Sequence, residues 1–489
     1  MSAAWNTGHV QHPTAAASGA MPELRESGAG DSPAEAEIGG IVEPASGVKK
    51  GFGSRVGRYT FHYHRRFTAL QGVVQGWLAP TALGFIAIKQ LGDGLSADAQ
   101  KTYTTLISWF PSLVMVTAPF WHQDRLGIKS YLRKAAIYGK LLPLLLFAFV
   151  TEPWQVVVLI TLSTLLCAGV PPAQNALLGS NYEPCERERY YGLAKLWMIP
   201  LFMAANFAFM EWMDNWGSAY RVVLPLCGVI GFISLYTLRK VKMRRPITPA
   251  VKFSTRMPRA DATRFSKRAG RIAQPWRNAV KLQLRDRNFG LYELGFMSYG
   301  MAFMMMLPVV PNYYDKVFPD VGFAEYSLHV AVAFQGTTFL THLLLRGRHS
   351  GWSPARIAGT AFGLLALYPT MLLLGEQFHN LNIALCGFLI FGIGMTLVDY
   401  AWSLGPIRFA KGGDATPYVS AHTMMVGVRA FFAFPLSLLV MIVSDNVFWP
   451  VLSVAIAFCL IGMMCNVWLG MRLRGAAGDG MWVKKTVGG

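Results

Sequence analysis

Charged residues are scarce in this chain. Asp, Glu, Lys and Arg make up 15% of its 489 residues, whereas about a quarter is usual in soluble proteins. Hydrophobic residues make up 53%, and the mean hydropathy is positive. This composition favours a membrane protein over a soluble one.

The residue patterns of enzymes and metal proteins are also missing. We find no pair of catalytic carboxylates in a credible site, no Ser–His–Asp arrangement, no phosphate-binding glycine loop and no His/Cys cluster with metal spacing. The six cysteines are expected to be small thiols without a disulfide framework. We therefore predict no enzyme activity, no cofactor and no metal. Without a nucleotide-binding motif, ATP is not the direct energy source, and an ion gradient or facilitated diffusion remains.

The N-terminal region lacks large apolar residues. Residues 1–60 are rich in Ala, Gly, Ser, Pro and Glu, which predicts a disordered tail. A secretory signal is excluded because no basic start is followed by an apolar core. The basic stretch His62–Arg66 then predicts that the N-terminus stays in the cytoplasm.

Twelve apolar segments follow, each near the ~20 residues that a helix needs to cross a bilayer. Lys and Arg gather in every second loop, which predicts that those loops and both termini are cytoplasmic in a multi-pass protein of the plasma or inner membrane. The expected segments are about 67–89, 103–121, 132–150, 154–177, 190–211, 219–238, 290–312, 325–345, 355–375, 381–403, 421–443 and 448–470.

The net charge of +19 is concentrated between Arg239 and Arg287, where 16 Lys/Arg stand against two Asp. A cytoplasmic loop explains this excess, so no nucleic-acid partner is predicted. The loop divides the segments six and six. The expected domains are a disordered cytoplasmic tail (1–60), a six-helix bundle (61–238), a basic cytoplasmic linker (239–287), a second six-helix bundle (288–472) and a cytoplasmic C-terminal tail (473–489).

A polar loop separates the second and third segments. Residues 124–134 read DRLGIKSYLRK, which resembles the loop between the second and third transmembrane helices of the major facilitator superfamily. That family usually has Gly four residues before the Asp, where this chain has Phe120. The resemblance extends from about 65 to 472. It implies an all-α membrane protein with twelve transmembrane helices in two pseudo-symmetric six-helix bundles and a central cavity that opens alternately to each side.

The two halves share short patterns, as expected for parallel transporter repeats. The fifth segment has Gly192, Lys195 and Pro200, and the eleventh has Gly427, Arg429 and Pro435. In both, a cation lies two or three residues after the Gly and the Pro lies eight after it. A basic stretch at 346–351 is a reduced counterpart of the loop at 124–134, without the Asp.

The resemblance places candidate transport residues, because the first, fourth, seventh and tenth helices of this family line the cavity. Gln71 and Gln75 share one face of the first helix, and Gln335 makes the eighth polar. Hydrogen bonding between helices is the alternative role for the amides. The lining residues that the family implies are Gln75, Gln174, Asn175, Tyr299 and Asp399.

Two cations lie within predicted spans, where each requires a partner or a role. Gly192-x-x-Lys195 resembles the Gly-x-x-Arg of sugar–proton symporters, in which the arginine helps to bind substrate. Alternatively, Lys195 extends its long stem to the cytoplasmic headgroups. Arg429 is expected to pair with Asp399, either as a structural ion pair or as a switch that breaks during transport. His422 and Glu293 are expected at the membrane edge.

The loop at 124–134 also has an implied role in the conformational cycle. In the family, its Asp faces the N-terminus of the eleventh helix when the transporter is open outward, where the helix dipole stabilises a carboxylate. Asp124, Arg125 and Gly127 are therefore the expected latch.

These observations predict a secondary active transporter of a small anionic or hydroxyl-rich solute, coupled to protons through Asp399 and working by alternating access. The expected partners are the solute, protons and the lipid bilayer, and the protein is expected to be a monomer. The alternative is a non-transporting membrane scaffold or assembly factor on the same fold, with the tail and basic linker as its functional surface. In the family that this chain resembles, many proton-coupled drug exporters have an arginine in the fourth helix and a glycine-rich pattern in the fifth. This chain has neither feature, which argues against a multidrug exporter.

Overall fold

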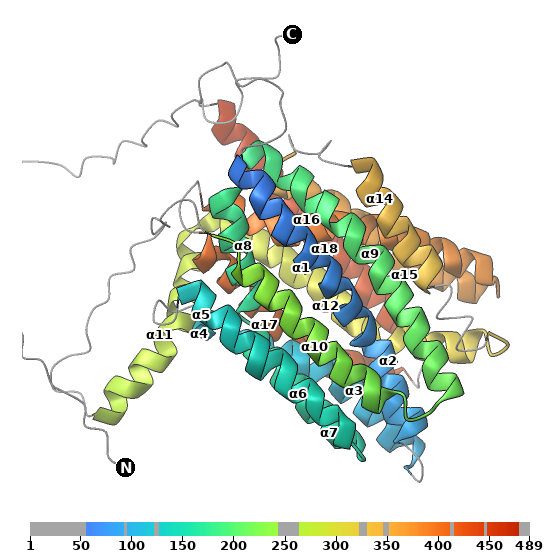
Figure 1. The fold of residues 1–489 in the computed structure, drawn as a ribbon. Coiled ribbons are helices and arrows are strands. Elements are labelled where there is room, and N and C mark those ends of the chain that lie inside the picture. Colours follow the sequence, from blue (N-terminus) through green and yellow to red (C-terminus); the bar gives the residue numbers. More distant parts are fainter. Residues whose placement is uncertain are drawn as a thin grey trace, which may run out of the picture. The chain divides into compact units, whose positions relative to one another are not determined.

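The computed structural model describes residues 55–91, 95–121, 127–242, 264–321, 330–345, 352–410, 415–444 and 447–478, and these residues are helical apart from short connections. Figure 1 shows long helices running side by side along one common direction. We call residues 55–242 the first half and residues 264–478 the second half.

The first half contains long α-helices and several that are interrupted by π or 3₁₀ turns. Its elements are α1 (Arg55–Trp77), α2 (Pro80–Phe85), η1 (Ile86–Gln90), α3 (Ala97–Leu113), η2 (Val114–Thr117), α4 (Ala118–Trp121), α5 (Gly127–Lys134), η3 (Ala135–Leu141), α6 (Leu142–Leu145), η4 (Leu146–Phe149), α7 (Pro153–Cys167), α8 (Val170–Asn181), α9 (Pro184–Asn215) and α10 (Tyr220–Arg239).

The second half contains longer uninterrupted helices. Its elements are α11 (Arg264–Arg285), α12 (Arg287–Val317), η5 (Val330–Gly336), α14 (Thr337–Leu345), α15 (Pro354–Gln377), α16 (Leu381–Phe409), α17 (Thr416–Val443) and α18 (Trp449–Gly478). Because α1 begins at Arg55, the end of the predicted tail at 1–60 is helical. Similarly, α18 runs past the predicted end at 472.

Eight helical stretches of the described residues are long and apolar enough to cross a membrane, and each coincides with a predicted segment. They are Pro153–Asn181, Glu186–Met213, Tyr220–Arg239, Arg287–Val310, Pro354–Gln377, Leu381–Phe409, Thr416–Met441 and Trp449–Arg474. The other four predicted segments coincide with the interrupted helices α1–η1, α3–α4, α5–η4 and η5–α14.

Proline explains the first interruption. Ala79 precedes Pro80 and is extended, with φ −57° and ψ 136°. A proline ring disfavours the helical conformation of the residue before it, so α1 ends and α2 restarts with Pro80 in its first turn. The apolar pattern at 67–89 identifies the segment, and the Ala79–Pro80 step breaks it.

The predicted cytoplasmic ends of neighbouring helices meet. Near the start of α1, Tyr59 donates a hydrogen bond to the Lys240 carbonyl just after α10, 3.2 Å away. Near the start of α17, Tyr418 donates to Asp286 Oδ2 at the start of α12, also over 3.2 Å. The start of the first predicted segment thus meets the end of the sixth, and the starts of the seventh and eleventh segments meet each other. This is the arrangement expected if successive segments cross the membrane in alternating directions. We call this end of the bundle the predicted cytoplasmic end.

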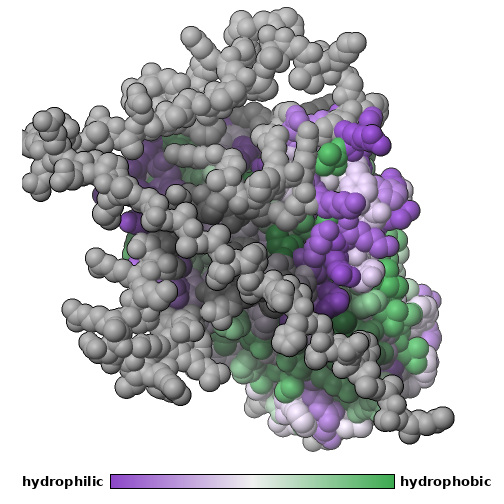
Figure 2. All heavy atoms as spheres, turned by 60° about the vertical axis from the view of Figure 1, so that its left-hand side comes forward, coloured by the Kyte–Doolittle hydropathy of each residue, from purple (hydrophilic) through white to green (hydrophobic). Residues whose placement is uncertain are grey.

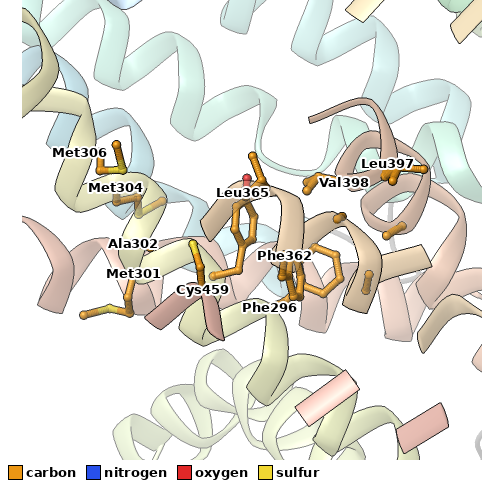
Figure 3. Close-up of a cluster of buried hydrophobic side chains, with 14 of the residues drawn as sticks. Phe296, Met301, Ala302, Met304, Met306, Phe362, Leu365, Leu397, Val398 and Cys459 are labelled. Carbon is orange, nitrogen blue, oxygen red and sulfur yellow. The ribbon is translucent and has the colours of Figure 1, made fainter. Parts of the chain in front are cut away.

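Hydrophobic packing is largely separate in the two halves. Two buried clusters come entirely from the first half, while the largest comes mainly from the second. Figure 3 shows part of the largest cluster, in which Phe296 and the methionines of α12 pack with Phe362 of α15, Val398 of α16 and Cys459 of α18. Residues 53–489 form one compact unit by their contacts, so the division into two bundles at the expected boundaries stays a prediction.

The predicted basic loop at 239–287 contains a helix. In α11, seven Lys/Arg and no acids occur in 22 residues. Trp276 of α11 donates to the Val116 carbonyl of η2 over 2.8 Å and stacks on Phe120 of α4, while Ala279 and Leu282 are buried. Because this apolar face packs on the bundle, the segment becomes a helix that contacts both halves; Figure 1 shows it projecting from the end where α1 begins.

The described surface is strongly apolar. Figure 2 shows green apolar side chains over the lower part of the visible described surface, with purple hydrophilic groups above and beneath them. Large side chains are exposed, including Phe149 at 77%, Trp197 at 54% and Val443 at 76%. Such a surface suits contact with lipid hydrocarbon, because patches of this kind on soluble proteins are rare.

Candidate functional site

The central feature of the candidate site is an ion pair between the two halves. Lys195 of α9 in the first half lies with its Nζ 3.0 Å from Asp399 Oδ1 of α16 in the second half. Their side chains are 18% and 26% exposed. Both residues were predicted as transport residues, and the structure brings them together within an apolar helix bundle.

Three further side chains complete this ion pair. The Tyr191 hydroxyl donates to Asp399 Oδ1 over 3.0 Å and also bonds to Ser403 Oγ. His342 of α14 has its Nε2 3.6 Å from Asp399 Oδ2. The ammonium of Lys195 lies 5.3 Å from the centre of the Tyr191 ring. We call these five residues the Lys195–Asp399 network.

Helical spacing positions this network. Tyr191 and Lys195 are four residues apart on α9, and Asp399 and Ser403 are four apart on α16, so each pair shares one helix face. Gly192 allows the two helices to approach closely, because a Cβ at this position would overlap the Tyr400 hydroxyl. The sequence repeat identified Gly192 and Lys195, but no local signal indicated that Lys195 pairs with Asp399, which is 204 positions away.

A second ion pair joins the halves nearer the predicted cytoplasmic end. Glu188 of α9 pairs with Arg408 at the end of α16, and Arg408 also donates to the Trp352 carbonyl before α15. Glu188 lies one turn before Tyr191, on the same face of α9. Its side chain is 4% exposed, whereas that of Arg408 is 26% exposed, so the pair is only partly shielded from its surroundings.

A close backbone contact joins the halves at α17. A Cβ at Gly427 would overlap the backbone of Leu113 and Val116 in α3 and η2. Trp109 of α3 contacts Phe434 of α17, with ring centres 6.3 Å apart. The sequence repeat marked Gly427 as the counterpart of Gly192, and both glycines lie where the two halves touch.

The predicted partner of Asp399 was wrong. Arg429 does not pair with Asp399 among the described residues; it donates from Nη1 to the Phe296 carbonyl over 3.0 Å and lies over the Trp402 ring. It is 6% exposed and lies against Gly300 of α12, within the second half. Arg429 therefore belongs to a different polar cluster.

Glu293 and His422 were expected at the membrane edge; their level in the bilayer stays a prediction, but the structure buries both within the protein and pairs them. Glu293 is 2% exposed, His422 is 1% exposed, and His422 Nδ1 lies 2.7 Å from Glu293 Oε1. The apolar residues around each gave no sign of a partner, because the two are 129 positions apart in the chain.

The other candidates are distributed through the bundle. Gln71 donates to Ser234 Oγ of α10 over 2.9 Å, which is a bond between helices of the first half. Tyr299 is buried, donates to the sulfur of Met395 over 3.2 Å and stacks on Phe362. The structure leaves Gln75 exposed, Gln174 and Gln335 half-buried and Asn175 buried. Their roles in transport stay predictions.

The predicted latch is described only in part. Asp124 and Arg125 lie outside the described residues, as does the basic stretch at 346–351. Gly127 begins α5 with φ +63°, a left-handed conformation that favours glycine. The latch therefore stays a prediction. Among the residues that the structure describes, no group of three or more His, Cys, Asp or Glu is arranged to hold a metal ion.

These features define an all-helical, multi-pass membrane protein whose halves meet through polar contacts inside an apolar bundle. The sequence model of the Major Facilitator Superfamily matches residues 68–433. The chain belongs to this superfamily, and it is a transporter of a small solute rather than an enzyme.

Solved structures share the fold. The human organic anion transporter MFSD10 (TETRAN) has a TM-score of 0.59 at 13% identity, with 85% of this chain and 99% of that chain covered. A variant of the E. coli fucose:proton symporter FucP has a TM-score of 0.55 at 14% identity, with 86% and 99% covered. At these identities the likeness shows the fold alone. No curated protein sequence matches the chain.

Proposed function

We propose that the protein carries a small anionic solute together with a proton by alternating access, with the Lys195–Asp399 network as the solute and coupling site. The observation that carries this proposal is the ion pair between the halves, in which both side chains remain partly exposed. A solute held by residues from both halves has different contacts once the halves separate, so its affinity differs between the two conformations. This difference is what couples solute binding to the conformational change.

The charge balance of the network favours a proton as the companion of the anion. With His342 neutral, the charges of Lys195 and Asp399 cancel. An anion alone would leave the site with one uncompensated negative charge, which is costly in a low-dielectric environment. If Asp399 takes up a proton, its attraction for Lys195 falls, and the ammonium becomes free to bind the anion with the site still neutral.

The hydrogen bonds around Asp399 support this exchange. As a carboxylate, Asp399 accepts from Lys195 and Tyr191. After protonation, the Tyr191 hydroxyl retains Ser403 Oγ as a partner, so no buried hydroxyl is left without a hydrogen bond.

The contacts between the halves also favour one conformation. The Glu188–Arg408 pair joins the halves near the predicted cytoplasmic end, and the Gly427 contact joins them near the middle of α17. These contacts support a state of the transporter that is closed at the predicted cytoplasmic end. The positive charge of the loops supports the assignment of this end to the cytoplasm.

The test is solute uptake by the purified protein in liposomes with an acidic outside and a neutral inside. The panel is radiolabelled lactate, succinate, benzoate and galactose. We expect uptake of one or more of the carboxylates that disappears when a protonophore removes the pH gradient. Asp399→Asn should abolish acid-driven accumulation, and Lys195→Met should abolish uptake altogether.

Lys240→Met is the matched control, because Lys240 is exposed at the end of α10 and lies outside the network. It should transport like the wild type. Uptake of galactose alone would replace the anion with a hydroxyl-rich solute, and uptake of carboxylates that is insensitive to Lys195→Met would overturn the site assignment.

A further inference from the structure

Glu293, His422 and Arg429 form a second buried ionisable cluster that the Lys195–Asp399 network does not use. Glu293 lies on α12, and the other two lie on α17. Each is at most 6% exposed. Ionisable groups this deep in a membrane helix bundle are costly and require a function or full neutralisation.

The pair already shares one proton. His422 Nδ1 and Glu293 Oε1 are 2.7 Å apart, so one proton lies in the hydrogen bond between them. The two outer atoms, Glu293 Oε2 and His422 Nε2, are buried and have no hydrogen-bond partner in the described part of the chain. A second proton therefore has two defined positions, on Nε2 or on Oε2.

The surroundings set the charge of each state. Rings enclose the imidazole, with Trp402 at 4.0 Å and Phe296 at 4.8 Å between centres. With one shared proton, the pair carries a single negative charge, which the guanidinium of Arg429 balances. A second proton makes the cluster positive by one charge, and this state is favoured when an anion enters the protein.

Among the described residues, the other titratable groups named on α11 and α12 are hydrogen-bonded or exposed, and the polar neighbour on α18 is an amide. On α12, Asp286 lies two turns towards the helix start and accepts from Tyr418 of α17, and the Tyr292 hydroxyl donates to the Ala401 carbonyl. On α18, the Asn466 amide lies against Gly295. Three bases on α11 have exposed side chains: Arg277, Lys281 and Arg285.

We propose that Glu293 and His422 form a proton-binding site, separate from Asp399, that takes up one proton during the transport cycle. This inference deepens the proposed proton coupling and rests on it for its role in transport. His422 lies about one turn beyond Tyr418 on α17, and Glu293 lies about two turns beyond Asp286 on α12. It also lies on α17, the helix whose Gly427 contacts the first half, so opening of the predicted cytoplasmic end changes the surroundings of the site.

Infrared difference spectroscopy of the full-length protein in bilayers tests the proton site without any solute. On acidification, the wild type should gain a protonated-carboxyl band that Glu293→Gln loses. His422→Asn should keep the band at a shifted midpoint pH. Glu376→Gln, which removes a half-buried carboxylate near the end of α15, is the control and should keep the band and its midpoint.

The outcomes separate this inference from the proposed function. An unchanged difference spectrum in Glu293→Gln would overturn the proton site, whatever the uptake panel shows. If Glu293→Gln fails to fold, Glu293→Asp and His422→Asn replace it. A shifted carboxyl band in Glu293→Asp and a shifted midpoint pH in His422→Asn would support the proton site, and an unchanged band and midpoint in both would overturn it. In liposomes that take up lactate, Glu293→Gln should lose acid-driven accumulation and keep lactate exchange across the membrane, whereas Lys195→Met should lose both.

Discussion

The Lys195–Asp399 pair should control the balance between the two conformations. At 3.0 Å, two unit charges attract by about 5 kcal/mol at an effective dielectric constant near 20. The cost of removing both charges from water offsets much of this attraction. Contacting residues of this kind couple by about 0.5–3 kcal/mol in double-mutant cycles.

A coupling of about 1–3 kcal/mol corresponds to a change of about 5–150-fold in the ratio of closed to open protein. Lys195→Met and Asp399→Asn should each lower the population closed at the predicted cytoplasmic end. Each variant leaves one charge without its partner, so the double variant should lie closer to the wild type than the sum of the single effects. The reversed pair, Lys195→Asp with Asp399→Lys, should restore part of the closed population.

Spin-label distances provide the assay. Labels at Lys134 on α5 and Arg474 on α18 lie at exposed positions in different halves, both near the predicted cytoplasmic end. In a background without native cysteines, a longer distance population reports opening of that end. Identical distance distributions in the wild type and in both single variants would refute the view that this pair holds the halves together.

Three further perturbations follow from the contacts between the halves. Gly427→Val places a side chain against the α3–η2 backbone, so we expect overpacking to weaken the closed state by about 1–3 kcal/mol; the same label distances measure it, and Gly179→Ala, where a Cβ has ordinary room, is the control. Glu188→Gln leaves the partly exposed guanidinium of Arg408 without the Glu188 carboxylate and should destabilise the protein by about 1–3 kcal/mol in thermal unfolding. Trp276→Phe removes the hydrogen bond to η2 while keeping an aromatic ring against α4, and a loss of about 1 kcal/mol is expected in the same assay.

Much of the fold could be predicted because a bilayer constrains helix length and loop charge. Apolar runs of the required length located the eight long spans. The interrupted helices were not predictable in the same way, because the break depends on single residues such as Pro80 and on local packing. The helix α11 was mistaken for a loop because its many bases conceal the apolar face that carries Trp276 and Leu282. That face becomes evident only from its packing against α4, α12 and α17.

The candidate site was predicted as residues but not as pairs. Depth in a helix identified Lys195, Asp399 and Arg429, since a charge within an apolar run is costly wherever it points. The partner of Asp399 depends on how each helix is rotated about its own axis and on how the two halves pack together. A difference of four residues, slightly more than one turn, separates Asp399 on α16 from Ser403, and only the packing of α9 against that face brings Lys195 rather than Arg429 to the carboxylate.

The separation of the two cation sites has a consequence for transport. Lys195 pairs across the halves, whereas Arg429 bonds within the second half, so a change in the interface alters the surroundings of Lys195 first. The Glu293–His422 bond joins two helices of the second half and does not depend on a contact with the first half. Under the proposed mechanism, a solute that competes for Lys195 would therefore act at the interface, whereas a proton on the Glu293–His422 pair would stay within the second half. We propose that this division of roles allows a proton and an anion to bind in either order and still cross together.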